Sequence, residues 1–316
     1  MSEGTRTPDR LDHNQELYQL SYAHRETVES TSAGLPLDVG HQAREDARFA
    51  MSIPTPSASS FALVTGASSG IGEQFARRLS ERGFRVAVVA RRKDRLDRLV
   101  QELGGEERAV AIAADLAVPE DRDGIAARLD ELGAEVEVLV NNAGFGVYDS
   151  FLGSGREQEL RQVRVDVEAV VDLMSRYLPG MVARKRGAVI NMSSTAGFQP
   201  LPYNAGYSAA KGHVLLLSES VGEEVREHGV SVTAVCPGPV PTEFQEANDA
   251  GYFSARLPGV VEVSPARVAA DALSAADRGR RMVIPGGPAV RAAFGPNRLL
   301  PSALTLAVSK RLMKRA

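Results

Sequence analysis

Three side chains in the second half of the chain have the types and the spacing needed for proton transfer. Tyr207 and Lys211 are four residues apart, so in a helix they lie on one face. A tyrosine has an unperturbed pKa of about 10, which is too high for an efficient base near neutral pH. A neighbouring ammonium group favours the phenolate and lowers that pKa. Ser194 stands 13 residues before Tyr207, at the end of an expected strand, from where its hydroxyl can point to the same place.

A glycine-rich segment follows the first expected strand. It reads TGASSGIG at 65–72, and its three glycines allow a tight turn and a close approach of the backbone to a pyrophosphate. The next helix supplies free N–H groups and a positive dipole for that anion. The spacing is not that of a GxGxxG motif, and a glycine-rich turn alone is also compatible with an ordinary strand-to-helix connection.

Polar residues also stand where the third and fourth expected strands end. Asp115 lies at the end of the third, and an Asn-Asn-Ala-Gly motif at 141–144 ends the fourth. Each residue type is also common in turns. In doubly wound folds, however, nucleotides bind at the edge where the carboxyl ends of the strands meet. The order and the intervals of these residues therefore favour a nucleotide site at that edge.

The elements that must position these residues alternate along the chain from residue 61 to residue 285. Short apolar runs predict buried strands at 61–65, 85–90, 110–116, 136–140, 188–192, 230–235 and 282–284. Helices are expected between them, the longest at 157–183 and 207–227. This alternation predicts an α/β fold with a doubly wound parallel sheet that helices cover on both faces.

With these motifs in this order, the sequence resembles the short-chain dehydrogenase/reductase family. The resemblance covers about residues 61–285 and rests on TGASSGIG, Asp115-Leu116, NNAG, Asn191-Met-Ser-Ser194, Tyr207-Ser-Ala-Ala-Lys211 and Cys236-Pro-Gly-Pro-Val-Pro-Thr242. It implies a seven-stranded Rossmann-like sheet in a single domain, a nicotinamide cofactor, and hydride transfer between that cofactor and a carbonyl or secondary alcohol. Members commonly pair through their two long helices, so a homodimer or homotetramer is expected.

The resemblance also assigns roles to individual residues. Tyr207 exchanges a proton with the substrate oxygen, Lys211 lowers the pKa of Tyr207 and holds the nicotinamide ribose, and Ser194 hydrogen-bonds the reacting oxygen. The expected cofactor-binding residues are Gly66, Ser68, Ser69, Gly70, Ile71, Gly72, Arg91, Arg92, Asp115, Leu116, Asn142, Ala143, Gly144, Tyr207, Lys211, Pro237, Gly238, Val240 and Thr242.

The end of the second strand bears on the choice of cofactor. An NAD enzyme offers a carboxylate there to the ribose hydroxyls, but this chain has Arg91, followed by Arg92 and Lys93. A guanidinium binds a 2′-phosphate through two hydrogen bonds. Arg92 and Lys93 are also compatible with a solvated basic helix start. The sequence favours NADP(H) over NAD(H).

One position departs from the family pattern. In the long helix the family usually has an asparagine that holds a water of the proton relay, and this chain has Asp166. An ionised carboxylate accepts hydrogen bonds but donates none, and its charge stabilises Lys211 as a cation. We therefore count Asp166 as a catalytic candidate. The alternative function is a nucleotide-binding protein of this fold with little turnover because of Asp166.

Composition sets further limits. The chain has 316 residues, a net charge of −3 and one cysteine, Cys236. The charge argues against nucleic-acid binding, and the single cysteine excludes an internal disulfide and fits a reducing cytoplasm. We expect no metal site, and Cys236 is interpreted as a small buried residue rather than a reactive thiol. The start of the chain lacks the pattern of a secretory signal.

Three segments divide the chain. Residues 1–58 are expected to form a flexible extension, 59–288 the catalytic domain, and 289–316 a basic amphipathic tail with six Lys/Arg and no acidic residue. The tail is expected to dock on the protein's own surface, on a second subunit, or on an anionic membrane surface. The last of these corresponds to an alternative function as a membrane-surface lipid ketoreductase.

The segments expected to line the substrate pocket are rather apolar. They are 145–148, 198–203 and 244–258, the last of them expected to be a mobile lid. An apolar pocket suggests a hydrophobic carbonyl or alcohol substrate.

Overall fold

The computed structural model describes residues 52–244 and 262–313. All of them belong to a compact unit formed by residues 48–316. Most of the extension expected at 1–58 and most of the lid expected at 244–258 lie outside the described residues. Ile53, which we expected in the flexible extension, is buried in the core. The packed part of the chain therefore begins before the first strand.

Seven strands form one parallel sheet in the order β3-β2-β1-β4-β5-β6-β7. They are β1 (Ser60–Thr65), β2 (Arg85–Ala90), β3 (Ala109–Ala113), β4 (Glu135–Asn141), β5 (Gly187–Met192), β6 (Val230–Val235) and β7 (Met282–Val283). Every residue of β1, β5 and β6 is buried, which explains the consecutive apolar residues at 61–64 in β1 and 188–190 in β5. β6 also buries the polar residues Ser231 and Thr233. The expected doubly wound, Rossmann-like α/β fold is confirmed, and the order of the strands reverses between β1 and β4.

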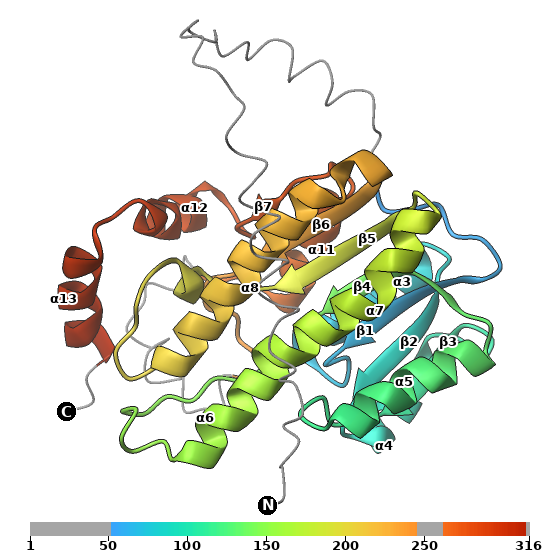
Figure 1. The fold of residues 1–316 in the computed structure, drawn as a ribbon, viewed down its shortest axis with the longest axis horizontal. Coiled ribbons are helices and arrows are strands. Elements are labelled where there is room, and N and C mark those ends of the chain that lie inside the picture. Colours follow the sequence, from blue (N-terminus) through green and yellow to red (C-terminus); the bar gives the residue numbers. More distant parts are fainter. Residues whose placement is uncertain (1–51, 245–261, 314–316) are drawn as a thin grey trace, which may run out of the picture. The chain divides into compact units, whose positions relative to one another are not determined.

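Helices cover both faces of the sheet, and each face has its own hydrophobic core (Figure 1). The helices α3 (Gly70–Glu81), α4 (Lys93–Glu102) and α11 (Pro265–Ala276) contribute to one core. The helices α5 (Pro119–Glu131), α7 (Ala169–Ala183) and α8 (Ala205–Glu224) contribute to the other. Pro119 and Pro265 begin their helices, where a missing N–H leaves no helical bond unmade.

The helix expected at 157–183 is present but is not uniform. It consists of α6 (Arg156–Val163), a π-helical turn η1 (Arg164–Glu168) and α7. The π turn contains Asp166, whose side chain is completely buried. Such single π turns occur often at functional sites.

The C-terminal segment does not form one amphipathic helix. It consists of α12 (Pro288–Phe294), the 3-10 turn η5 (Gly295–Arg298) and α13 (Ser302–Met313), because Pro296 and Pro301 interrupt the helical pattern. Val290 of α12 is buried in the same core as α3 and α11. Part of the expected tail therefore packs as part of the domain. Within 52–244 and 262–313, no helix is both long and apolar enough to cross a membrane.

Candidate active site

A cavity of about 550 Å³ runs along the edge where the strands end. Its volume lies in the range typical of small-molecule and cofactor sites. The loops that follow β1 to β6 contribute to it, and it lies at the reversal of strand order, where doubly wound sheets bind their ligands. Every site residue expected from the sequence lines this cavity except Gly72 and Asp166, which lie directly behind its wall.

The glycine-rich loop is held in a tight conformation by the end of β4. Gly66 and Gly70 have φ of +65° and +61°, the left-handed region that favours glycine. The Thr65 hydroxyl accepts hydrogen bonds from the N–H groups of Asn142 and Ala143 at 2.9 and 3.0 Å. A Cβ atom at Gly72 would lie 2.3 Å from the Gly66 carbonyl oxygen. The loop therefore requires its glycines, and its backbone lines the cavity.

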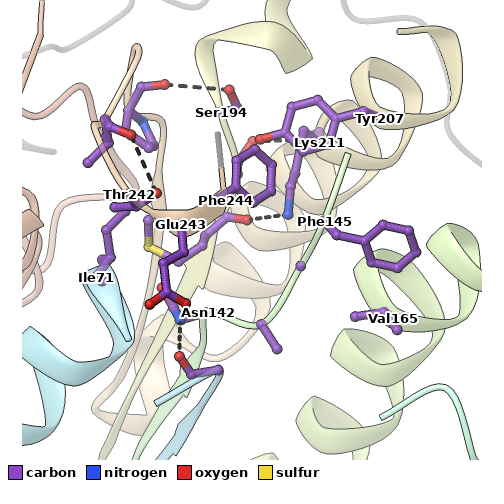
Figure 2. A pocket seen from close by; sticks show the side chains of 18 of the residues that line it. Ile71, Asn142, Phe145, Val165, Ser194, Tyr207, Lys211, Thr242, Glu243 and Phe244 are labelled. Carbon is purple, nitrogen blue, oxygen red and sulfur yellow. Dashed lines mark hydrogen bonds between the residues drawn. The ribbon is translucent and has the colours of Figure 1, made fainter. Parts of the chain in front are cut away.

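Ser194, Tyr207 and Lys211 converge at the other end of the cavity (Figure 2). Tyr207 and Lys211 belong to the first turns of α8, and the Lys211 Nζ lies 5.5 Å from the centroid of the Tyr207 ring. Lys211 donates a hydrogen bond to the Met192 carbonyl oxygen at 3.1 Å. The Ser194 hydroxyl accepts one from the Ala196 N–H at 3.1 Å, which fixes its position at the start of η2 (Thr195–Phe198).

The environment of Tyr207 differs from the sequence-based expectation. Burial raises the pKa of the Tyr207 phenol well above its ordinary value, the nearby Tyr148 and Asp166 raise it further, and the side chain of Ser194 counteracts only part of this. The net direction is therefore opposite to the lowering expected from Lys211, whose ammonium donates to the Met192 carbonyl and pairs with Asp166. Tyr207 is therefore a protonated phenol at neutral pH and is suited to donate a proton.

Asp166 lies behind Lys211. Its Oδ2 is 3.4 Å from the Lys211 Nζ, and its Oδ1 accepts a hydrogen bond from the Phe145 N–H at 3.0 Å. Burial raises the pKa of the Asp166 carboxyl, and the Lys211 ammonium and the Phe145 N–H counteract part of that rise. A Cβ atom on Gly144 would lie 3.0 Å from both Asp166 and Lys211, so the glycine leaves room for this pair.

At the glycine-loop end, Arg92 rather than Arg91 contacts the loop. Arg92 donates hydrogen bonds to the hydroxyls of Ser68 at 2.9 Å and Ser69 at 3.0 Å. Its guanidinium also pairs with the carboxylate of Glu243 at 2.8 Å. Arg91 is exposed and lines the same part of the cavity.

Among the cavity-lining residues that the sequence does not predict are Arg161, Glu243 and Phe294, and Arg95 joins them by pairing with Glu243. Arg161 donates a hydrogen bond to Asp115 at 2.5 Å, and with the Ala117 N–H it holds the pKa of Asp115 below its ordinary value, although burial alone would raise it. Phe294 of α12 packs directly on Gly238, where a Cβ would lie 2.9 Å from its ring. All of these contacts join distant parts of the chain, so no local sequence motif predicts them.

Cys236 is buried, and burial raises the pKa of its thiol to about 12, so it is not a reactive thiolate. Within the described ranges, no group of three His, Cys, Asp or Glu side chains is placed to hold a metal ion.

The comparison with known families agrees with this geometry. The sequence model described as short chain dehydrogenase matches residues 60–252. The chain belongs to the short-chain dehydrogenase family. It is therefore an oxidoreductase that transfers hydride between a nicotinamide cofactor and an alcohol or carbonyl group.

Individual short-chain dehydrogenases give a similar picture. The chain is 38% identical over 201 residues to a Streptomyces violaceoruber protein named granaticin polyketide synthase putative ketoacyl reductase 1, covering 62% of this chain and 74% of that one. A short-chain dehydrogenase from Sphingobium yanoikuyae, solved with NADPH, has a TM-score of 0.66 and 33% identity, covering 81% and 96% of the two chains. A bulky-bulky ketone specific alcohol dehydrogenase from Comamonas testosteroni has a TM-score of 0.64 and 27% identity, covering 82% and 96%.

The residues of this short-chain dehydrogenase fit a nicotinamide dinucleotide. Gly66, Gly70 and Gly72 keep Cβ atoms out of the loop that would cradle the pyrophosphate. The cavity continues from this loop to Tyr207 and Lys211, so one elongated ligand can reach both ends.

Proposed function

We propose that the protein is an NADP(H)-dependent reductase of apolar ketones. The observation that carries this proposal is the buried, protonated Tyr207 beside Ser194 and Lys211, in one cavity with the Arg92 guanidinium. A reduced nicotinamide, when bound, supplies the hydride. The rest of the chemistry belongs to the side chains of this chain.

Tyr207 acts as the general acid. Its Oη–H bond breaks and the proton goes to the carbonyl oxygen of the substrate as that oxygen becomes an alkoxide. The Ser194 hydroxyl donates a hydrogen bond to the same oxygen and orients it. The phenolate left on Tyr207 is stabilised by the Lys211 ammonium, which Asp166 keeps cationic. Tyr207 carries its proton at neutral pH, as its role as general acid in ketone reduction requires.

Selectivity for NADP(H) is assigned to Arg92, supported by Arg91. Arg92 and the hydroxyls of Ser68 and Ser69 form a set of donors suited to a 2′-phosphate. The Sphingobium yanoikuyae relative, whose structure contains NADPH, supports this reading. Arg91→Asp would oppose the same phosphate and weaken NADPH more than NADH.

The proposed substrate is a bulky apolar ketone. The lining near Tyr207 includes Phe145, Tyr148, Leu201 and Phe244, and the Tyr207 ring lies 5.8 Å from that of Phe244 and 6.4 Å from that of Tyr148. The relatives named as a putative ketoacyl reductase and as a bulky-bulky ketone specific alcohol dehydrogenase support the same substrate class. Charged lining residues such as Arg92, Asp115 and Arg161 gather instead toward the glycine-loop end.

A homodimer or homotetramer working in the cytoplasm completes the proposal. Val163, Val171 and Leu216 expose apolar side chains on the long helices α6, α7 and α8, which support pairing of two copies there. The buried free thiol of Cys236 fits a reducing compartment. A membrane-surface lipid ketoreductase is the second candidate, favoured by the exposed Leu304 and Val308 beside the cations of α13.

Tyr207→Phe tests the reaction. We expect kcat for the NADPH-dependent reduction of an apolar ketone to fall about a hundredfold or more, because the general acid is lost, while the Kd for NADPH stays nearly unchanged. NADPH oxidation and nucleotide fluorescence measure the two quantities, and the chain has no tryptophan to interfere. Retained turnover would refute the assigned role.

Arg92→Ala tests the cofactor assignment. We expect about a tenfold to hundredfold weaker binding of NADPH, with little change for NADH, because hydrogen bonds to a charged phosphate are lost. Lys93→Ala is the matched control. It removes the same charge one residue away, and Lys93 is paired with Asp97 at the surface. Equal losses for both cofactors, or a wild-type preference for NADH, would overturn the assignment.

A further inference from the structure

Glu243 places a carboxylate in the group of donors that faces the glycine-rich loop. Its Oε2 lies 2.8 Å from an Nη atom of Arg92, and its Oε1 lies 2.5 Å from an Nη atom of Arg95. Glu243 follows β6, whereas the two arginines belong to the start of α4, about 150 residues earlier in the chain. Figure 2 shows Glu243 among the residues that line the cavity.

The groups around this carboxylate match an anion with more than one acceptor oxygen. Arg92 contacts Glu243 with one Nη and the hydroxyls of Ser68 and Ser69 with the other, so two guanidinium groups and two hydroxyls gather in one place. Arg95 and Arg92 hold the pKa of Glu243 at about 2, so the carboxylate is ionised at every pH at which the protein works. The phosphate-binding set is therefore occupied by an acidic side chain of the protein itself.

We propose that Glu243 determines cofactor specificity by competing with the 2′-phosphate of NADP(H) for Arg92 and Arg95. This inference rests on the proposed function, in which Arg92 binds that phosphate. A 2′-phosphate must either displace the carboxylate or share the two guanidinium groups with it, and both cases weaken binding. NAD(H) carries a hydroxyl there and does not need the guanidinium groups. Glu243 thus reduces the ratio of the affinity for NADP(H) to the affinity for NAD(H). It also remains paired with the two arginines when no phosphate is bound.

The size of the effect follows from the exposure of the three side chains. Arg92, Arg95 and Glu243 are 41%, 35% and 43% exposed, and ion pairs at such half-exposed positions are weak. The competition therefore changes the dissociation constant of a 2′-phosphorylated ligand by about threefold to tenfold, too little to exclude NADP(H). The contribution decreases as salt concentration rises, because exposed charges are screened.

The same geometry permits one opposite role, which an experiment separates. Glu243 would instead help NADP(H) if its main effect were to hold Arg92 and Arg95 in the position that receives the phosphate. The two roles predict changes of opposite sign when the carboxylate is removed.

Glu243→Gln and Glu243→Ala, each in the full chain, are the test. The probes are adenosine 2′,5′-bisphosphate and adenosine 5′-monophosphate, which differ only in the 2′-phosphate, with binding measured by calorimetry. We expect the bisphosphate to bind about threefold to tenfold more tightly to Glu243→Ala, less so to Glu243→Gln, and the monophosphate to change by less than about twofold. Glu131→Gln, which removes an exposed carboxylate paired with Arg128 on α5, is the matched control and changes neither.

Each outcome decides between the possible readings. Weaker binding of the bisphosphate, unchanged binding, or an equal gain for both probes would overturn the competition. The Arg92→Ala variant keeps this test separate from the proposed function. If Arg92→Ala weakens the bisphosphate but the Glu243 variants do not strengthen it, the competition alone fails. If Arg92→Ala leaves the bisphosphate unaffected, the assignment of Arg92 to the phosphate fails as well.

Discussion

At the scale of the residue, the carboxylate of Asp166 influences the proton chemistry of the site. Asp166 stands where relatives of this family usually have an asparagine, and it is fully buried 3.4 Å from Lys211. Its negative charge acts on Tyr207 in two opposite ways: it raises the pKa of the phenol directly, and it keeps the Lys211 ammonium charged, which favours the phenolate. Because burial and the direct effect of Asp166 raise the pKa of Tyr207, the phenol is protonated, which is the form that reduction requires.

Asp166→Asn therefore shifts the pH dependence in a defined direction. Removing the charge lowers the pKa of Tyr207, so ketone reduction decreases at a lower pH than in the wild type, and alcohol oxidation begins at a lower pH. At neutral pH we expect kcat for reduction to change less than about tenfold, because Tyr207 and Ser194 remain. The pH profiles of kcat for both directions are the measurement.

Glu157→Gln is the control for this variant, because it removes an exposed carboxylate from the neighbouring helix α6. An unchanged profile in Asp166→Asn, or a shift to higher pH, would contradict the electrostatic role. An increase in kcat of several orders of magnitude would instead support the alternative that Asp166 makes the natural protein a poor catalyst.

At the scale of the element, the sequence predicts most of what the structure contains. Buried strands such as β1 and β2 contain runs of consecutive apolar residues, because they are buried on both faces, and such runs can be recognised in the sequence. Tyr207, Lys211 and Ser194 were found because local spacing places them on one helix face and at one strand end. These are properties of a few consecutive residues, and they need no knowledge of the rest of the fold.

The elements that sequence reasoning missed depend on distant contacts. The π turn η1 has no period of its own in the sequence, and its place is known only from the packing of Asp166 against Lys211 and the Phe145 N–H. Arg122 of α5 is nearly completely buried and binds both Glu168, the last residue of this turn, and Asp172 of α7. These bonds connect the π turn to α5. The pairing of Glu243 with Arg92 is likewise invisible locally.

At the scale of the whole molecule, the C-terminal segment joins the domain core to an outward apolar surface. Val290 is buried, Phe294 packs on Gly238 at the cavity, and Ser309 of α13 donates a hydrogen bond to the Pro200 carbonyl. Thr305 and Ser309 face inward, while Leu304 and Val308 are more than half exposed. These exposed apolar side chains are the observation behind the proposed contact of α13 with a membrane surface or a second copy.

Two shortened chains separate the roles of this segment. A chain ending at Gly287 loses Val290 and Phe294, and we expect a destabilisation of about 2–5 kcal/mol and weaker NADPH binding, since buried side chains are removed beside Gly238. A chain ending at Leu300 lacks only α13 and the residues after it, so its NADPH affinity and Tm should stay close to those of the full chain. Thermal unfolding and nucleotide fluorescence measure both.

Sedimentation with liposomes then shows what α13 contacts. With anionic vesicles at low salt, we expect the full chain to sediment and the chain ending at Leu300 to remain in solution, because the exposed apolar side chains of α13 and its cations Lys310 and Arg311 are removed together. Neither chain should sediment with neutral vesicles. If neither chain sediments with anionic vesicles and only the full chain changes its oligomeric state with concentration, the partner of α13 is a second copy of the protein. In either case, removing α13 leaves the packing of Phe294 on Gly238 in place, and the contact with the pocket that it removes is the Ser309 hydrogen bond to the Pro200 carbonyl.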